Sequence, residues 1–400
     1  MMKILMICNK SPYPKTDGGA IGLYNNITAL SKAGYKIKVI AANTNKNWVK
    51  AKDVPDDFMA ITNLELIPIN LSLNVFSALY NLLSGQSYHI SRFYTKQFEN
   101  RIIEVLKSEE FDIIQLEYLP MALYIDVIRK HTKAPIVLRN HNVEYKIWEK
   151  ITKNTANPLK KWYLKQLVKT LKHFEISALR KADGIISTTT IDADEFLKLA
   201  PGKKVIAIPT SFNIEQLPDD YSLCGNPNIF HLGAMNWYPN EEGVKWFVQE
   251  VFHLIRNRIP EINLHLAGRN MPEWLTNLNV DGIIVDGEVD DAFDYMRKFD
   301  IMVVPLLSGS GIRVKIIEGM ALGRAIVTTT IGAEGINVEN NKNIIIADSP
   351  SDFADAVVSL YNDAEKCQQL SENARSFVEE EHTSEKLMIK LTNFYNRLIK

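Results

Sequence analysis

Short apolar runs alternate with longer amphipathic stretches along nearly the whole chain, and this alternation restricts the fold more than any other feature. Such runs, rich in β-branched and aliphatic residues, are typical of strands buried on both faces. They predict strands at Lys3–Cys8, Tyr35–Ala41, Leu64–Ile69, Asp112–Leu116, Pro135–Arg139, Gly184–Thr188, Val205–Ile208, Ile229–Leu232, Ile262–Ala267, Ile283–Val285, Ile301–Pro305, Ala325–Thr330 and Ile344–Ala347. Alternating strands and helices form parallel sheets covered on both faces, with ligands beyond the carboxyl ends of the strands. We therefore expect an α/β fold with doubly wound sheets.

The length of the chain predicts two such sheets. With 400 residues, the chain is too long for a single hydrophobic core. Residues 209–227 are polar and rich in proline, as expected of a linker. We expect one domain over residues 1–209 and a second over 210–385. The final segment, 386–400, is predicted to be a helix that returns to the first domain.

Composition and charge exclude several classes of protein. The formal net charge of −1 argues against a nucleic-acid-binding protein. Three scattered cysteines lack the spacing of a metal or redox site. The apolar run at the N-terminus is too short for a signal sequence, and no stretch approaches the length of a membrane span. We therefore expect a cytoplasmic protein with inert thiols.

The stretch Pro305–Gly335 carries the strongest indication of a ligand site. A strand, a loop of small residues and a helix predicted over Ile312–Leu322 present backbone N–H groups to a phosphate. Arg313 and Lys315 fall in the first helical turn, where the helix dipole disfavours cations, and a bound anion would remove that conflict. Glu318 lies one turn further on the same face. We expect a diphosphate at the loop and the cations, with Glu318 accepting hydrogen bonds from hydroxyls such as those of a ribose.

Two positions in the first half follow predicted strands. Gly18 and Gly19 precede a helix expected over Ala20–Lys32, without the spacing of a dinucleotide fingerprint. They either let a ligand approach the backbone or only shape a turn. His141 follows the strand that ends at Arg139. We favour a role in orienting or polarising a reacting group over that of a structurally satisfied histidine.

A long helix is predicted over Asn157–Asp183, with lysines beside an apolar stripe. Two interpretations are open: a solvated face on a helix packed against the core, which we favour, or a basic helix lying on an anionic membrane. Further on, Asp192 and Asp194 resemble a metal-binding pair, but helix capping explains them better. No metal site is predicted.

The motifs together resemble those of retaining family 4 glycosyltransferases of the two-domain GT-B architecture. The resemblance covers most of the chain and is strongest in HLGAMNWYPNEEGVKWF (His231–Phe247), LAGRN (Leu266–Asn270) and the Pro305–Gly335 stretch. The N-terminal P-x-x-x-x-G-G loop and the NHNVE segment (Asn140–Glu144) are similar to the subgroup that acts in bacterial polysaccharide assembly.

The resemblance implies two Rossmann-like domains with the active site in the cleft between them. It implies transfer of a hexosyl unit from a nucleotide diphosphate sugar to a glycan or lipid-linked acceptor, with retention, and with no cofactor or metal. His141 and Glu318 are the expected catalytic residues. The expected donor-binding residues are Gly18, Gly19, Asn240, Arg269, Ser310, Gly311, Arg313, Val314, Lys315 and Glu318.

The chain departs from the family pattern in two places. Of the two glutamates spaced E-x7-E, Glu318 matches the second, which binds the donor ribose, but Ser310 stands in place of the first. The arginine and lysine that follow the first strand of the second domain in many relatives are absent. Arg313 and Lys315 are the natural substitutes. Asn240 is interpreted either as a helix cap or as a donor contact.

Three alternative functions stay open at this point. An epimerase of nucleotide sugars would use the same fold and donor. A catalytically silent binding subunit is suggested by Ser310, although Lys315, Glu318 and His141 argue against it. A non-enzymatic membrane adaptor would rest on the basic helix alone.

Overall fold

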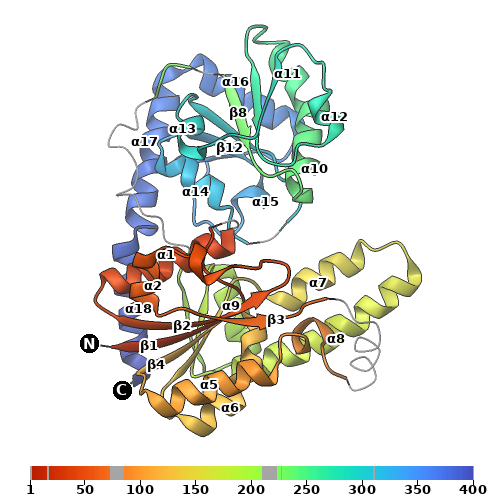
Figure 1. Ribbon diagram of the computed structural model, residues 1–400. Helices are drawn as coiled ribbons and strands as arrows, with labels where there is room; N and C mark the ends of the chain where they lie inside the picture. The colour runs from red at the N-terminus through yellow and green to blue at the C-terminus, as the bar shows by residue number, and fades with distance from the viewer. Residues whose placement is uncertain are drawn as a thin grey trace. The chain divides into compact units, whose positions relative to one another are not determined.

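The computed structural model describes residues 2–15, 18–72, 85–209, 223–226, 228–309 and 311–399. It divides into two compact units, the first comprising residues 1–211 and 387–400 and the second residues 212–386 (Figure 1). The predicted domain boundary falls between residues 209 and 210, where a stretch outside the described residues begins. Most of the predicted linker also lies outside the described residues.

The first unit is built on a parallel sheet. In the described part of the chain it has seven strands in the order β3-β2-β1-β4-β5-β6-β7. Their bounds are β1 Lys3–Cys8, β2 Lys36–Thr44, β3 Glu65–Ile69, β4 Ile113–Glu117, β5 Ile136–Asn140, β6 Gly184–Ser187 and β7 Lys204–Ala207. The described helices are α1 Gly18–Lys32, η1 Ala51–Asp53, α2 Asp56–Thr62, α4 Tyr88–Ser91, α5 Lys96–Ser108, η2 Leu119–Tyr124, α6 Ile125–His131, α7 Glu144–Lys153, α8 Pro158–Lys181, α9 Thr190–Leu199 and α18 Ser384–Ile399.

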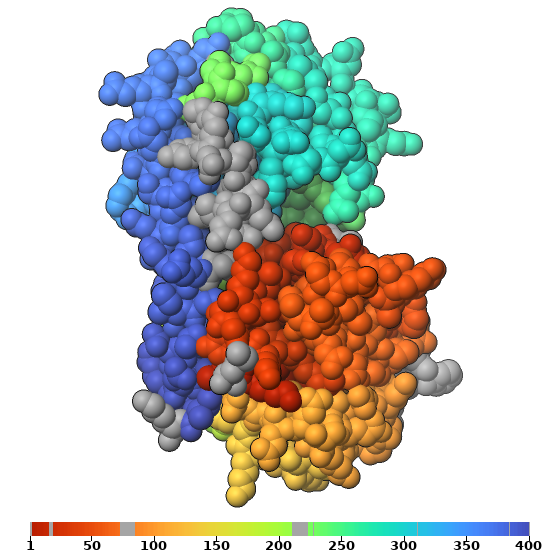
Figure 2. All heavy atoms as spheres, turned by 60° about the vertical axis from the view of Figure 1, so that its left-hand side comes forward, coloured from red at the N-terminus to blue at the C-terminus, as the bar shows by residue number. Residues whose placement is uncertain are grey.

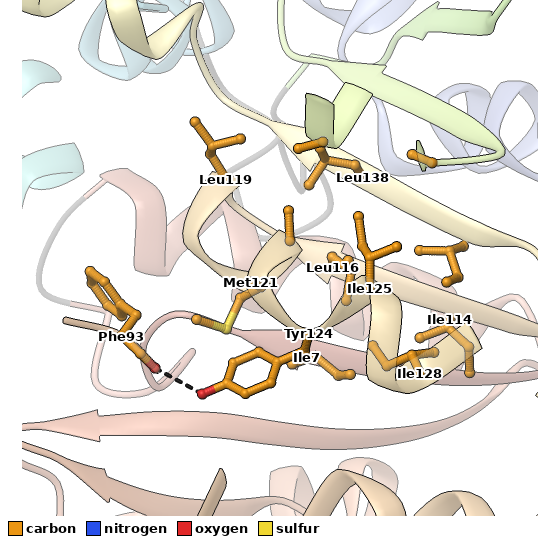
Figure 3. Packing of buried hydrophobic residues seen from close by; sticks show 14 of the residues in the cluster. Ile7, Phe93, Ile114, Leu116, Leu119, Met121, Tyr124, Ile125, Ile128 and Leu138 are labelled. Atoms are coloured by element: carbon orange, nitrogen blue, oxygen red, sulfur yellow. Dashed lines mark hydrogen bonds between the residues drawn. The ribbon is translucent and has the colours of Figure 1, made fainter. Parts of the chain in front are cut away.

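Successive strand residues point to opposite faces, so each face of this sheet has its own core. On one face, Leu116 and Leu138 pack against α5, α6, α8 and η2. Figure 3 shows this packing, in which the Tyr124 hydroxyl donates to the carbonyl of Phe93 at 2.8 Å. On the other face, Ile113 and Val137 pack against α1, α2 and α18.

The last helix, α18, belongs to the first unit from Leu387 onward. Its buried side chains Leu387, Leu391, Phe394 and Tyr395 join the core beneath α1. The space-filling view shows the C-terminal segment of the chain lying against the N-terminal part of the first unit (Figure 2). About 170 residues of the second unit thus intervene between two parts of the same core.

The second unit repeats the architecture. Its described strands form a six-stranded parallel sheet in the order β10-β9-β8-β11-β12-β13. Their bounds are β8 Ile229–Leu232, β9 Leu264–Ala267, β10 Ile283–Gly287, β11 Ile301–Val304, β12 Ala325–Thr328 and β13 Ile345–Ile346. The helical segments are α10 Tyr238–Trp246, η4 Phe247–Val251, α11 Phe252–Arg256, α12 Glu273–Thr276, α13 Ala292–Met296, α14 Val314–Ala321, α15 Thr330–Ala333, α16 Pro350–Asn362 and α17 Ala364–Glu381. The predicted fold class, two Rossmann-like doubly wound domains, is confirmed.

The starts of three helices depend on local geometry. Helix α10 begins at Tyr238, because Pro239 in its first turn has a backbone angle suited to a helix start. The helix predicted from Ile312 begins at Val314, which makes Arg313 its N-cap. Helix α9 begins at Thr190, directly after its cap Thr189. Local turn chemistry decides each of these starts.

No helix of the described ranges combines the length and apolar character needed to cross a membrane.

Candidate functional site

The amino group of Lys315 lies at the carboxyl end of β8 in the second unit. Its Nζ donates to Asn240 Oδ1 at 2.8 Å and lies 3.4 Å from His231 Nε2. His231 Nδ1 lies 2.9 Å from the carbonyl oxygen of Val303, to which it donates, and this leaves Nε2 as an acceptor. Among the described residues no carboxylate lies within ion-pair distance of Lys315. Two neutral groups therefore hold this cation.

Gly233 makes room for this arrangement, which we call the Lys315 cluster (Lys315, Asn240, His231 and Gly233). A Cβ atom on Gly233 would lie 2.5 Å from Lys315 Nζ and 2.8 Å from Asn240 Nδ2. Asn240 Nδ2 in turn donates to the carbonyl of Ala234 at 2.9 Å. The interpretation of Asn240 as a helix cap is wrong, because Trp237 is the N-cap of α10 and Asn240 lies inside its first turn. A donor contact by Asn240 stays a prediction.

Burial shifts the charge state of the cluster. It lowers the pKa of Lys315 to about 7, and the nearby Arg313 acts in the same direction while Glu318 opposes it. Burial also raises the pKa of Glu318 to about 7 against the effect of Lys315. Burial and Lys315 together lower the pKa of His231 well below its usual value. An anion beside Lys315 would favour the charged form of the lysine and raise its pKa.

Arg313 lies at the start of α14 as its N-cap residue and is buried. Its Nη1 donates to the carbonyl of Gly311, and its guanidinium lies over the indole ring of Trp237, 5.4 Å from the ring centre. Burial lowers the pKa of Arg313, with Glu334 opposing. The predicted position in the first helical turn is thus corrected by one residue, and the side chain is buried against Trp237 and Gly311.

The loop between β11 and α14 is fastened to α10. Ser308 Oγ donates to Glu242 Oε2 at 2.5 Å. At Gly243 a Cβ atom would lie 2.3 Å from the carbonyl oxygen of Pro305, so only glycine permits this approach. Glu242 of α10 therefore holds the loop through Ser308.

The remaining predicted donor residues of the second unit lie in this loop, in α14 and just beyond β9. Gly311 has a positive φ of 80° and Val314 is the first residue of α14. Arg269 has an exposed side chain just beyond β9, and its carbonyl accepts from the Met235 amide at 2.9 Å. Ser310 lies outside the described residues. The Glu318 carboxylate makes no hydrogen bond within the described part of the chain.

In the first unit, His141 lies just beyond β5 and is partly exposed. Its carbonyl accepts from Thr188 Oγ1 at 2.8 Å, and the edge of the Tyr118 ring packs against its imidazole. Its Nε2 lies 3.9 Å from Oε2 of Glu117, the last residue of the neighbouring strand β4. A carboxylate therefore faces the imidazole across the carboxyl edge of the sheet.

Glu117 is itself part of a buried polar chain, the Glu117 cluster (Glu117, Gln115, Arg139, His141 and Tyr395). Gln115 Nε2 donates to Glu117 Oε1, and the Tyr395 hydroxyl of α18 donates to Gln115 Oε1. Arg139 Nη1 lies 3.9 Å from Glu117 Oε1. Burial acts to raise the pKa of Glu117, but Arg139 and His141 outweigh it, so the pKa is lowered. Glu117 is thus a carboxylate at neutral pH.

A second set of carboxylates fixes the segment after His141. Glu144 accepts from the Tyr118 hydroxyl at 2.6 Å and lies 3.2 Å from His89 Nε2. Glu175 of α8 accepts from the amides of Glu144 and Tyr145 at 3.0 Å each. The start of α7 is therefore anchored from two sides, which explains the acidic residue of the NHNVE segment.

Gly18 and Gly19 are the first two residues of α1, two residues before the predicted start. The structure leaves both interpretations of this pair open. Asp192 lies in the first turn of α9, where its amide is capped by Thr189 Oγ1 at 2.9 Å. No three His, Cys, Asp or Glu side chains of the described chain lie close enough together to hold a metal ion.

Four residues that shape the site in the second unit were not predicted from the sequence: Gly233, His231, Trp237 and Glu242. All four belong to the His231–Phe247 motif, in which only Asn240 was given a role. His231 lies in β8, whose four residues are all buried, so a histidine within a buried strand was the available signal.

Two family models match the chain. Residues 16–216 match the model described as Glycosyltransferase Family 4, and residues 226–363 match the one described as Glycosyl transferases group 1. The first of these alone covers half of the chain.

Relatives and solved structures agree with the family models. An uncharacterized 44.6 kDa protein in the cps region of Klebsiella pneumoniae is 21% identical, over 97% of this chain and 98% of that protein. The fold is similar to that of sucrose-phosphate synthase from Thermosynechococcus elongatus, with a TM-score of 0.68 at 16% identity over 100% of this chain and 99% of that one. It is also similar to a TarM variant of S. aureus in complex with Fondaparinux, alpha-GlcNAc-glycerol and UDP, with a TM-score of 0.67 at 13% identity over 99% and 100% of the two chains.

Proposed function

This chain belongs to glycosyltransferase family 4, and from that premise we propose that it transfers a hexosyl unit from a nucleoside diphosphate sugar to a glycan or lipid-linked acceptor. We further propose that the transfer retains the anomeric configuration and needs no metal ion. The observation that carries the proposal is the Lys315 cluster, a buried cation with a depressed pKa and no carboxylate partner among the described residues.

The diphosphate is the anion that completes this cluster. Breaking the bond between sugar and phosphate builds negative charge on the leaving diphosphate. Lys315, Arg313 and the N–H groups at the start of α14 stabilise that charge, by several kcal/mol in a closed site. The chain's own cations thereby supply what a metal ion supplies in other transferases.

Glu318 and His141 have separate roles in this proposal. Glu318 accepts hydrogen bonds from the ribose hydroxyls, one helical turn from the phosphates. His141 supports the positive charge that develops at the anomeric carbon. The Glu117 carboxylate, 3.9 Å from His141 Nε2, adds negative charge beside the imidazole.

The relatives suggest the donor and the acceptor class. The TarM structure is a complex with UDP and alpha-GlcNAc-glycerol, which supports a uridine donor for this chain. The relative in a cps region supports a role in assembling a surface polysaccharide.

A thermal-shift screen over UDP, GDP, ADP and CMP identifies the nucleotide, because a ligand stabilises the fold in proportion to its affinity. We expect UDP to raise the melting temperature most. Incubation with the matching sugar nucleotide and an acceptor should then yield an α-linked product by NMR.

Three outcomes would contradict the proposal. Epimerised donor without acceptor would indicate an epimerase. Donor binding with turnover that is unaffected by His141→Ala and Glu318→Ala would indicate a silent subunit. A β-linked product from an α-linked donor would exclude retention.

A further inference from the structure

The helical hairpin of α7 and α8 carries an unusual concentration of positive charge. Residues 150–174 hold seven lysines and no aspartate or glutamate, although the chain as a whole has a net charge of −1. These lysines are Lys150, Lys153, Lys160, Lys161, Lys165, Lys169 and Lys172. The two helices pack against each other, and the turn that joins them projects from the first unit (Figure 1).

Exposed apolar side chains lie among these lysines. Leu159 is 80% exposed, Trp162 is 56% exposed and Ile151 is 43% exposed. They come from the last turn of α7 and the first turns of α8. We call residues 150–165 the hairpin tip. Large apolar side chains are rarely left exposed together without a partner.

The core does not account for these side chains. The stripe that α8 buries comprises Leu164, Leu167 and Leu171, three and four residues apart, as expected for the face packed on the first unit. Leu159 and Trp162 share a different face, nearly opposite that stripe by the 3.6-residue period. The favoured interpretation from sequence, a solvated face on a helix packed against the core, accounts for the stripe but not for the exposed leucine and tryptophan.

We propose that the hairpin tip docks on an anionic lipid surface. Lysines attract negatively charged headgroups, and tryptophan and leucine insert at the boundary between headgroups and acyl chains. A soluble polyanion would use the lysines but gain nothing from Leu159 and Trp162. A protein partner of ordinary composition would not present seven acidic groups in positions that match these seven lysines. The combination therefore fits a membrane interface best, and the proposal does not depend on the reaction proposed above.

The test is flotation of the full chain with vesicles. We expect it to float with vesicles of mixed phosphatidylcholine and phosphatidylglycerol and to stay behind with pure phosphatidylcholine. The triple variant Lys153→Gln, Lys160→Gln, Lys165→Gln removes three exposed charges. It should weaken partitioning by about fivefold per lysine, ~100-fold in all.

Matched controls are available in the same unit. Lys52→Gln, Lys107→Gln and Lys130→Gln change the net charge equally at exposed lysines elsewhere. Trp48 is 58% exposed, so Trp48→Ser is the counterpart of Trp162→Ser. Only the variants in the hairpin tip should lose vesicle binding, while nucleotide affinity stays unchanged in all of them.

The proposal fails if the chain binds neither kind of vesicle, or if the control triple loses as much binding as the tip triple. It also fails if heparin or DNA competes fully and Trp162→Ser binds vesicles like the unchanged chain, because that pattern identifies a polyanion site. Loss of sugar transfer with vesicle binding intact would count against the proposed reaction alone.

Discussion

At the scale of single residues, the unusual feature of the second unit is a lysine that burial has brought close to neutrality. Lys315 is surrounded by Asn240 and His231, both uncharged, and its pKa of about 7 reflects that setting. Such depressed values are frequent at functional sites, because an active site has to keep a charged group ready without a permanent partner.

Nucleotide binding should therefore be coupled to proton uptake. A bound diphosphate raises the pKa of Lys315, so above pH 7 the protein takes up a proton on binding and its affinity falls as the pH rises. Titration calorimetry in buffers of different ionisation enthalpy measures this uptake.

The variant Lys315→Met should lose the share of the proton uptake that Lys315 contributes, and its nucleotide affinity should be weaker by about 1.5–3 kcal/mol. Lys245→Met, at an exposed lysine of α10, is the control. Unchanged proton uptake in Lys315→Met would exclude the lysine as a phosphate ligand.

Glu318 should discriminate between nucleotides and bare diphosphate. If its carboxylate binds ribose hydroxyls, Glu318→Ala weakens UDP binding more than it weakens pyrophosphate binding. The expected difference is about 1–2 kcal/mol, as for a hydrogen bond to a charged group. Competition calorimetry with both ligands measures it. Equal losses would mean that Glu318 only supports the fold of α14.

At the scale of secondary-structure elements, α18 contributes to the environment of His141 from the far end of the chain. Its Tyr395 holds Gln115, Gln115 holds Glu117, and the Glu117 carboxylate faces His141. The hydrogen bonds run from α18 to Glu117, with each acceptor positioned by the next donor, and the Glu117 carboxylate lies 3.9 Å from the imidazole of His141.

Removing the Tyr395 hydroxyl should therefore alter turnover as well as stability. Tyr395→Phe leaves Gln115 with an unsatisfied acceptor, which costs about 1–3 kcal/mol of unfolding free energy. Tyr35→Phe is the matched control, because the Tyr35 hydroxyl contacts Thr392 of the same helix at 2.5 Å but takes no part in the Glu117 cluster. Both variants should lose stability in urea, but only Tyr395→Phe should lower kcat and shift its pH profile. The same kcat in both would show that the cluster is structural.

At the scale of the whole molecule, the first unit is completed only by the last residues of the chain. Leu387, Leu391, Phe394 and Tyr395 are buried against strands that precede them by more than 180 residues. Each buried side chain of this size contributes about 2–5 kcal/mol, and their sum is comparable with the stability of a whole domain.

A chain that ends at residue 386 should therefore lose the cooperative unfolding transition of the first unit and keep that of the second. Scanning calorimetry and limited proteolysis report on both. Addition of a peptide with residues 387–400 should restore part of the lost transition. Two unchanged transitions in the shortened chain would contradict this role of α18.

Much of the architecture was predictable because buried strands leave a strong pattern. Apolar runs such as Ile4–Cys8 predicted strands within about three residues of their observed ends, and the alternation with helices predicted parallel sheets. Helix starts were harder. Pro239 and Thr189 begin their helices through local turn geometry, which hydrophobic periodicity does not record.

The sequence by itself determined the fold class, the family and the residue types of the Pro305–Gly335 stretch, because these depend on local patterns of burial and spacing. Only the tertiary structure decided that Lys315 meets Asn240 and His231, that Arg313 lies beside Trp237, and that Tyr395 supports Glu117. These contacts join residues that lie between 75 and 280 positions apart, and their energies depend on burial. A pattern read along the chain contains neither the distances nor the dielectric surroundings that bring a lysine pKa to about 7.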